Sequence, residues 1–540
     1  MLHVLQREGE SFGQLIVNHA GGALERGGRR KKPKKGYRNS PDRGIMEKEH
    51  LTKRKDSIMG HLASKDAYKN LTDRINWFTQ GAPVSETLYQ ILQVLYTEDE
   101  AKHVALLPVR PFTAKKAAKI WHVSEAEAEK YLLHLCEKAL LVDSDHNGVR
   151  KFVMPPPMAG FIEFALMRTR GDIDQKYLGQ LYYQYMNVEE DFVKDLFFVT
   201  ETRLGRVFVQ EPVLTNEHTL HILDYERASH IIDEAEYIGL GICYCRHKML
   251  HAGHPCEIDA PLDVCLTFGN VARSLSEHGG YARLIDKAEA MDALERSYDH
   301  NLVQIGENVR ENPAFICNCC GCCCEALQAA RHFSPMQPVA TTNYIPHISA
   351  AACVGCGKCE KACPILAISM RDEEDGASAS SVKVGAEAPT SSASSAPSVQ
   401  GRTSASKGRT SASEGRTSAS KVVPDSAPHR RRAVIDTEIC LGCGVCAKNC
   451  PTKAILMERR PIQVITPVNS THRFVLQAIE KGTLQNLIFD NQAFANHRAM
   501  AAVFQTILQL PPLKQALASK QFKSVYLDKL LSSHANKNRK

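Results

Sequence analysis

Apolar side chains recur at helical spacing in the first well-patterned stretch of the chain. Ser85 is a suitable N-cap, and the residues behind it place an apolar stripe on one helix face: Leu88, Ile91, Leu92 and Leu95. Thr113 opens a second, shorter helix, and Ser124 followed by Glu127 has the spacing of a capping box for a third. Cys136, at the inward-facing end of this third helix, is predicted to be a core residue.

The pattern then changes from helix to strand. Leu140–Asp143 and Arg150–Met154 are predicted strands, and the residues between them read Asp-His-Asn-Gly. Asn-Gly between two apolar runs is a strong hairpin signal, because both residues tolerate the positive φ that a tight turn requires. The order of helix, turn, helix and hairpin resembles a winged-helix domain.

The rest of the chain divides by composition into helical, cysteine-rich and low-complexity stretches. Thr471–Lys481 and Ala499–Leu510 are predicted helices near the C-terminus, with Gly482 as a C-cap. The predicted fold class is therefore α+β with several domains. Its predicted parts are a disordered basic tail at 1–45, a winged-helix-like domain at 46–165, a helical connector at 166–235, a cysteine-rich metal-binding region at 236–335, a ferredoxin-like two-cluster module at 342–462 and a helical C-terminal region at 463–540.

A low-complexity tract interrupts the predicted two-cluster module. Between Asp375 and Pro428 the chain is dominated by Ser, Ala, Gly and Thr, and Gly-Arg-Thr-Ser-Ala-Ser occurs three times at a period of seven. Such a tract has little apolar surface to bury, so residues 371–430 are predicted to form a flexible insertion. No apolar a and d positions accompany the period, which argues against a coiled coil.

Charge and length add few constraints. The net charge of +7 over 540 residues is mild, and much of it sits in the runs Arg29–Lys35 and Arg430–Arg432, so it does not indicate a nucleic-acid-binding surface. We suspect that Met46 is the natural start and that the basic stretch before it is mis-assigned. No apolar run is long enough to span a membrane, and no secretory signal pattern is present, so a cytoplasmic location is predicted.

Eight cysteines in the C-terminal half form a repeated motif. Residues 353–364 read Cys-Val-Gly-Cys-Gly-Lys-Cys-Glu-Lys-Ala-Cys-Pro, and residues 440–451 read Cys-Leu-Gly-Cys-Gly-Val-Cys-Ala-Lys-Asn-Cys-Pro. Each is C-x2-C-x2-C-x3-C-P, a spacing that lets three thiolates wrap one side of an iron–sulfur cube while glycines turn the loop. A pair of structural zinc sites is the alternative, and the repeated proline and tight spacing argue against it.

The two motifs, with the flanking strands at Ala367 and Ala433, resemble bacterial-type two-cluster ferredoxins. That resemblance implies two [4Fe–4S] clusters, in which the fourth cysteine of each motif serves the other cluster. It assigns the first cluster to Cys353, Cys356, Cys359 and Cys450. It assigns the second cluster to Cys440, Cys443, Cys446 and Cys363. The chain departs from the family in its long spacer, which is tolerable because closing a loop costs only about 0.6 kcal/mol more per doubling of length.

A second group of cysteines lies upstream. Residues 241–247 read Gly-Ile-Cys-Tyr-Cys-Arg-His, residues 315–324 read Phe-Ile-Cys-Asn-Cys-Cys-Gly-Cys-Cys-Cys, and Cys256 and Cys265 stand between them. The pair of segments resembles one found upstream of ferredoxin modules in uncharacterised multi-domain iron–sulfur proteins of anaerobic bacteria. That resemblance implies no activity. An odd total of 19 tightly clustered cysteines favours metal binding over a disulfide framework.

Six cysteines within residues 317–324 cannot all bind one metal ion without crowding the backbone. We predict a third site that combines some of them with upstream cysteines, from the candidate set Cys245, Cys256, Cys265, Cys319, Cys320 and Cys323. Three interpretations remain open: a third iron–sulfur cluster, a zinc ion, or redox-active dithiols whose thiolates Arg246 would favour. The neighbouring His247, His251 and His254 are expected to be hydrogen-bonded or solvated rather than ligands.

The function predicted from these motifs is a relay of single electrons through two [4Fe–4S] clusters, to or from a partner oxidoreductase protein or subunit. The first alternative is an iron–sulfur oxidoreductase of unknown substrate, with a catalytic or third-cluster site at Cys243–Cys324. The second is a redox-sensing regulator that binds DNA. The candidate recognition helix Ser124–Lys138 argues against DNA, because it carries four Glu and two Lys. No glycine-rich nucleotide-binding motif is present.

Overall fold

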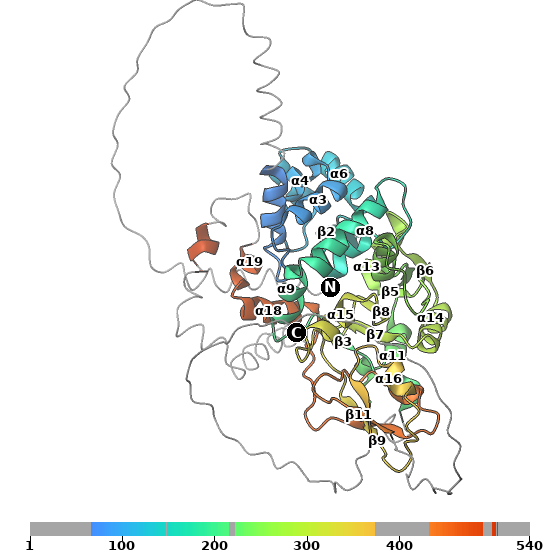
Figure 1. The fold of residues 1–540 in the computed structure, drawn as a ribbon. Helices are drawn as coiled ribbons and strands as arrows, with labels where there is room; N and C mark the ends of the chain where they lie inside the picture. Colours follow the sequence, from blue (N-terminus) through green and yellow to red (C-terminus); the bar gives the residue numbers. More distant parts are fainter. Residues whose placement is uncertain are drawn as a thin grey trace, which may run out of the picture.

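The computed structural model describes residues 66–146, 148–214, 222–372, 431–489, 499–503 and 505. The predicted basic tail at 1–45 lies outside the described residues, as does all but the first two residues of the predicted insertion at 371–430. The described part mixes helices and strands, as expected for the α+β class. In Figure 1 the N-terminal helices lie at one end, a larger sheet lies in the middle, and the strands of the C-terminal half lie at the other end.

The N-terminal helices and hairpin form close to where the apolar pattern predicts them. Ser85 caps α3 and Ser124 caps α6 through a complete capping box with Glu127. The strands reach further toward the turn than predicted, because His146 pairs with Val149 and leaves only residues 147 and 148 for the loop. Cys136 is buried in the core, as predicted. These elements are α3 (Glu86–Leu95), α4 (Glu98–Val104), α5 (Ala114–Trp121), α6 (Glu125–Glu137), β1 (Val142–His146) and β2 (Val149–Val153).

The stretch predicted as a helical connector holds helices and one strand. Its helices are α8 (Gln175–Tyr183), α9 (Asp191–Phe198) and α11 (Ala228–Glu234), and the short α7 (Ile162–Phe164) precedes it. The strand is β3 (Gly205–Val207), which pairs with β7 (Val303–Glu307) of the cysteine-rich region. The sequence prediction missed β3, because three residues are too few to show an alternating pattern.

A six-stranded antiparallel sheet forms the centre of the molecule, in the order β3-β7-β8-β5-β4-β6. The strands not yet given are β4 (Ile238–Gly241), β5 (Cys265–Phe268), β6 (Arg283–Ile285) and β8 (Phe315–Cys319). The helices between and after them are α12 (Tyr244–His251), α13 (Gly269–Glu277), α14 (Lys287–Asp299) and α15 (Glu325–His332). In the middle strands, alternate side chains take opposite faces of this sheet.

One face of the sheet carries a cluster of apolar side chains. Leu240 of β4, Leu266 of β5 and Ile316 of β8 pack in one buried cluster with Ile232 of α11 and Leu294 of α14. The intervening residues of β5 and β8 take the other face, and these include cysteines. The same two-residue period that buries the hydrocarbon side chains therefore gathers thiols on the opposite side.

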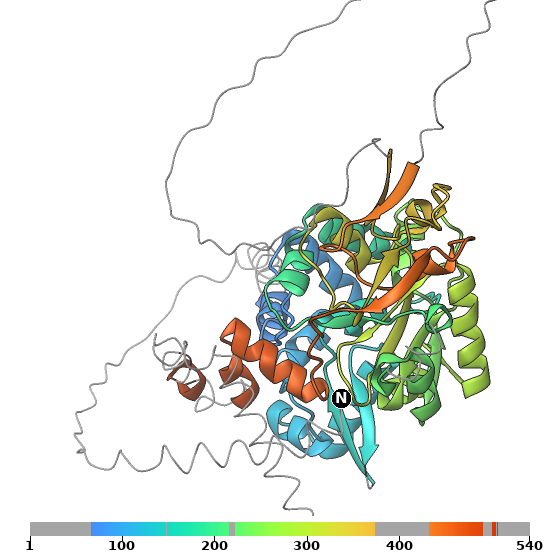
Figure 2. The same cartoon turned by 90° about the horizontal axis from the view of Figure 1, so that it is seen from below.

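The C-terminal half adds two short antiparallel sheets built from distant segments. β9 (Tyr344–Ile348) pairs with β12 (Ile455–Arg459), and β10 (Ile368–Asp372) pairs with β11 (Arg431–Ile435). Figure 2 shows the yellow and orange strands of each pair running side by side. The helices of this half are α16 (Lys358–Ala362), α17 (Val445–Lys448), α18 (Ser470–Lys481) and α19 (Leu484–Ile488).

Helix α18 is anchored to the central sheet by a buried ion pair. Arg473 donates to Glu307 at the end of β7 over 2.9 Å, and both side chains are at most 3% exposed. Asn469 caps the start of α18, and Gly482 ends it in a left-handed conformation, as predicted. Residues 499–503 are helical, within the second predicted C-terminal helix. Among the residues that the structure describes, no helix combines the length and apolar character that a membrane crossing requires.

The N-terminal hairpin is held to the end of α13 by a buried carboxylate. Asp143 of β1 accepts hydrogen bonds from Ser274 Oγ at 2.7 Å and from His278 Nε2 at 3.0 Å. The hydrogen bond and charge of Asp143 raise the pKa of His278 above its ordinary value. Burial alone would raise the pKa of Asp143, but the hydrogen bonds from His278 and Ser274 lower it. The pair is therefore strongest when His278 is protonated and Asp143 is ionised.

We expect the thermal stability of the protein to fall as the pH rises above the ordinary histidine pKa of about 6.5, because a raised histidine pKa contributes stability that is lost on deprotonation. His278→Gln should remove this part of the pH dependence, worth about 1 kcal/mol. Anaerobic calorimetry across this range measures it, with His230→Gln as the control histidine. An unchanged slope in His278→Gln would contradict the assignment.

Candidate metal centres

Each cysteine loop of the C-terminal half turns through left-handed glycines pressed against a strand. Gly355 has a φ of +69°, and a Cβ at this position would lie 2.3 Å from the carbonyl oxygen of Arg431. Gly442 has a φ of +76°, and its Cβ would lie 2.1 Å from the carbonyl oxygen of Tyr344. Only glycine fits these positions, both for its backbone conformation and for the close approach. The path of each loop against its strand is thereby fixed.

The first loop shares a cavity with one cysteine of the second motif. The cavity is lined by Cys353, Cys356, Cys359 and Cys450. Cys450 is presented by a turn in which the backbone N–H of Ala454 donates to its Sγ over 3.2 Å. Such a donor stabilises a thiolate, because it is aimed at the charge that the sulfur carries when it binds a metal. The thiol of Cys356 is exposed, and Val354 beside it is 59% exposed.

The second loop likewise lies close to one cysteine of the first motif. Cys363 lies within electrostatic range of Cys440, Cys443 and Cys446. Its Sγ accepts the backbone N–H of Ala367 over 3.2 Å, which repeats the arrangement at Cys450. Burial raises the pKa of Cys440 to about 11 and that of Cys443 to about 12. Metal binding at this set must therefore release protons.

This second set faces the interior of the molecule. The backbone N–H of Gln210 donates to the carbonyl of Cys443 over 2.9 Å, and Asn449 donates to Asn301 over 2.7 Å. The segment after Cys363 also contacts the loop that carries Cys320 and Cys322, because a Cβ at Gly321 would lie 2.2 Å from the carbonyl oxygen of Pro364, to which Arg331 of α15 donates over 2.7 Å. The two sets of four thus differ in setting: one lies at the surface and the other against the central sheet.

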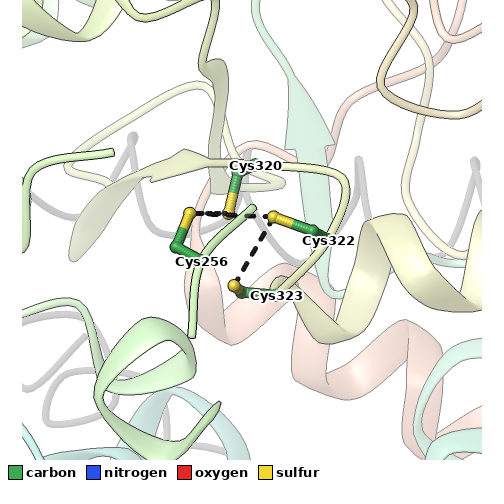
Figure 3. Close-up of side chains that lie close together, drawn as sticks. All are labelled: Cys256, Cys320, Cys322 and Cys323. Carbon is green, nitrogen blue, oxygen red and sulfur yellow. Dashed lines mark hydrogen bonds between the residues drawn. The ribbon is translucent and has the colours of Figure 1, made fainter. Parts of the chain in front are cut away.

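Four upstream cysteines converge on one point. They are Cys256, Cys320, Cys322 and Cys323, and their sulfur atoms all lie within 4.8 Å of one another (Figure 3). The Sγ–Sγ distances are 3.8 Å from Cys256 to Cys320, 3.7 Å from Cys256 to Cys322 and 3.6 Å from Cys322 to Cys323. In a tetrahedral centre with metal–sulfur bonds of about 2.3 Å, the sulfur atoms are about 3.8 Å apart. The spacing therefore suits a single tetrahedral ion.

Charge at this four-cysteine site is balanced by a buried guanidinium. Hydrogen bonds from the thiols of Cys322 and Cys323 lower the pKa of Cys320 to about 4, and the positive charge of Arg246 acts in the same direction. Arg246 is 2% exposed, and its Nη1 lies 3.8 Å from the sulfur of Cys320 and 3.0 Å from the carbonyl oxygen of Asn318. A thiolate is therefore available in this site at neutral pH.

The predicted third-site residues divide between two neighbouring sites. Cys256 and Cys323 belong to the four-cysteine site, Cys245, Cys265 and Cys319 line a neighbouring cavity, and Cys320 belongs to the first site and also lines the second. The sequence prediction missed Cys322, and it also missed three further cysteines of the neighbouring cavity, Cys243, Cys317 and Cys324. The alternation Cys317-Asn-Cys319 could have indicated that Cys317 and Cys319 lie on one side of a strand, because residues two apart on a strand share a face.

The histidines near these cysteines make other contacts. His247 Nδ1 hydrogen-bonds to the carbonyl oxygen of Leu166 at 2.8 Å, and its Nε2 lies 2.9 Å from that of His251. His254 stacks on the ring of Tyr183 at a centroid distance of 4.8 Å. These contacts agree with the expectation of hydrogen-bonded histidines.

Comparison with known proteins identifies the C-terminal cysteine motifs. Residues 352–454 match the family described as the 4Fe-4S dicluster domain, a span that includes both motifs and the residues between them. This segment is therefore an iron–sulfur, ferredoxin-like domain. The match leaves out all ten upstream cysteines. No curated protein and no solved structure matches the chain.

Alanine at Gly355 or Gly442 should disrupt the adjoining cluster site. Left-handed strain alone costs an L-residue roughly 1–2 kcal/mol, and here a backbone clash adds to it. Gly148→Ala is the matched control, because Gly148 has a φ of +75° and open space around its Cβ position. We expect lower iron content in Gly355→Ala and Gly442→Ala and full iron content in Gly148→Ala, measured after anaerobic purification. Equal iron content in all three variants would contradict the role of close approach.

Proposed function

We propose that this protein relays single electrons through two [4Fe–4S] clusters, to or from a partner oxidoreductase. The observation that carries the proposal is that each loop of three cysteines meets the fourth cysteine of the other motif. The surface cluster would be held by Cys353, Cys356, Cys359 and Cys450. The interior cluster would be held by Cys440, Cys443, Cys446 and Cys363. Clusters of this type take up and return one electron each.

The surroundings of the two sets suggest a direction for the relay. Cys356 and Val354 are exposed, so a partner protein could approach the surface cluster closely. The interior set is covered by the segment around Gln210 and lies next to the upstream cysteines through Pro364. The protein supplies N–H donors to the sulfur of Cys363 and of Cys450, and such hydrogen bonds tune a cluster potential. Electrons would pass between the surface partner and the interior of the same chain.

The four-cysteine site upstream is proposed to hold a structural zinc ion. Four thiolates at these distances satisfy the tetrahedral coordination that zinc prefers. A cubane needs its thiolates spread around a cube of iron and sulfide, which this tight group does not offer. Zinc there would fix the loop that carries Cys320 to Cys323 next to Pro364.

Single substitutions test the pairing of motifs. Cys450→Ala and Cys356→Ala should weaken or remove the same electron paramagnetic resonance signal of the reduced protein, because both belong to the surface set. Cys363→Ala and Cys443→Ala should affect the other signal. Cys136→Ala, a core cysteine of the N-terminal part, is the control and should retain both signals.

Two outcomes would refute different parts of this proposal. If Cys450→Ala removed the signal that Cys443→Ala removes, the exchange of fourth cysteines would be wrong. If the anaerobically purified protein held no acid-labile sulfide, the electron relay itself would be wrong.

Metal analysis tests the zinc site. The unsubstituted protein should hold about one zinc per chain, and the double variant Cys256→Ala/Cys322→Ala should lose it while keeping its iron. Cys136→Ala should keep both metals. Loss of iron and sulfide, rather than zinc, from the double variant would overturn the assignment.

A further inference from the structure

Six upstream cysteines that the four-cysteine site does not use line a single cavity. They are Cys243, Cys245, Cys265, Cys317, Cys319 and Cys324, which together we call the six-cysteine cavity. Its volume is about 70 Å³, and the rest of its wall is mostly apolar but includes Glu163, Arg246, Asn318, Cys320 and Glu325. Cys243 and Cys317 are partly buried, and the other four thiols are buried. So many thiols are rarely needed to fill a core that methyl groups could fill.

The fold delivers these thiols from four separate elements. Cys265 opens β5, and Cys317 and Cys319 lie two apart on β8, so their side chains share the sheet face opposite the hydrocarbon cluster. Cys243 is the N-cap of α12 and Cys324 is the N-cap of α15. Two helix N-termini therefore begin at the cavity, and their positive ends favour thiolates and other anions there.

The six thiols are spread around the cavity instead of converging on a point. They interact as a chain, because Cys245 hydrogen-bonds to Cys243 and Cys324, while Cys319 hydrogen-bonds to Cys317 and Cys324. Cys265 continues the chain from Cys317. Among the described residues, only the four-cysteine site has three or more ligand atoms within 4.8 Å of one another. In this respect the six-cysteine cavity is like the two ferredoxin sets and unlike the four-cysteine site.

A buried cation with unused donors faces this cavity. Arg246 lines it, and its Nε and Nη2 have no hydrogen-bond partner although the side chain is 2% exposed. Leaving charged donors buried and unpaired costs several kcal/mol, so a partner is expected for them. Sulfide and thiolate ions of a cluster are acceptors of the required charge. Arg246 also contacts Cys320, so it lies between the two upstream sites.

We propose that the six-cysteine cavity holds a polynuclear iron–sulfur cluster of its own, separate from the four-cysteine site. Thiolates spread around an apolar cavity fit a cluster in which each iron takes its own thiolate, whereas a lone ion would draw four of them together. Six ligands exceed the four that one cubane requires. This cluster is additional to the two of the ferredoxin-like domain and to the proposed zinc ion.

Its position fits exchange of electrons with the interior ferredoxin cluster, a step that rests on the proposed function. A Cβ at Gly321 would lie 2.2 Å from the carbonyl oxygen of Pro364, so the segments that carry these two residues are in direct contact. Pro364 follows Cys363 directly, and Gly321 lies between Cys320 and the N-cap Cys324. One electron accepted from the interior cluster would leave that cluster oxidised by one and the upstream cluster reduced by one.

The double variant Cys265→Ala/Cys317→Ala tests the site. We expect the holoprotein to lose about four or more iron atoms per chain, with matching acid-labile sulfide, relative to the unsubstituted protein. Both electron paramagnetic resonance signals of the ferredoxin-like domain and the zinc content should persist, which shows that the variant has folded. Cys136→Ala is the matched control for removal of a buried thiol. Unchanged iron and sulfide in the folded double variant would overturn the proposal.

A second measurement needs no variant. Native mass spectrometry of the anaerobically purified protein should show bound mass beyond two [4Fe–4S] clusters and one zinc ion. A mass that those groups account for in full would overturn the proposal, whether or not the double variant folds. Extra iron and sulfide in a protein without ferredoxin signals would refute the electron relay and leave the cluster in place.

Discussion

Each loop of three cysteines in the C-terminal half lies near a fourth cysteine from the other motif, and this contact between distant segments shapes that half of the molecule. Cys450 lines the cavity of the loop that begins at Cys353, and Cys363 lies within electrostatic range of the loop that begins at Cys440, although 76 residues separate Cys363 from Cys440. The pairings of β9 with β12 and of β10 with β11 bring the two halves together. The glycines then let each loop lie directly on the strand of the other half. Local turns, strand pairing and thiol placement are therefore one cooperative unit.

The upstream region also brings cysteines from separate segments together, but it does so within a single sheet. There the strands belong to one antiparallel sheet, and their period of two separates hydrocarbon from sulfur. Leu266 and Ile316 face α11 and α14, while Cys265 and Cys317 face the cavity. The loop after β8 then carries its remaining cysteines to two places, because the chain turns between Cys320 and Cys324. Cysteines that are close together in the sequence are thus divided between the four-cysteine site and the six-cysteine cavity.

Features encoded by neighbouring residues could be predicted from the sequence. The caps at Ser85 and Ser124, the hairpin turn and the C-cap at Gly482 each depend on a few adjacent side chains. The ferredoxin-like domain was recognisable for the same reason, since six of the seven intervals between its cysteines are short and fixed. The division of the ten upstream cysteines was not predictable. It depends on the register of β5 with β8, which the sequence spacing does not reveal.

Polar contacts between residues far apart in the sequence could not be predicted either. Asp143 and His278 are 135 residues apart, and Arg473 and Glu307 are 166 apart, so neither pair leaves a local pattern. The first pair joins the N-terminal hairpin to the end of α13, and the second joins α18 to β7 of the central sheet. The positions of the hairpin and of α18 therefore rest on buried charges that only the folded chain brings together.

The pairing of β10 with β11 has a consequence for how this gene can change. Asp372 and Arg431 are directly opposite each other in the ladder, and Arg431 Nε lies 3.6 Å from Asp372 Oδ1. The two ends of the stretch between these residues therefore lie at neighbouring positions. A change in the number of residues between Asp372 and Arg431 need not move any described cysteine, because closing a longer loop costs little. A circularly permuted chain opened in this stretch would keep every described strand intact.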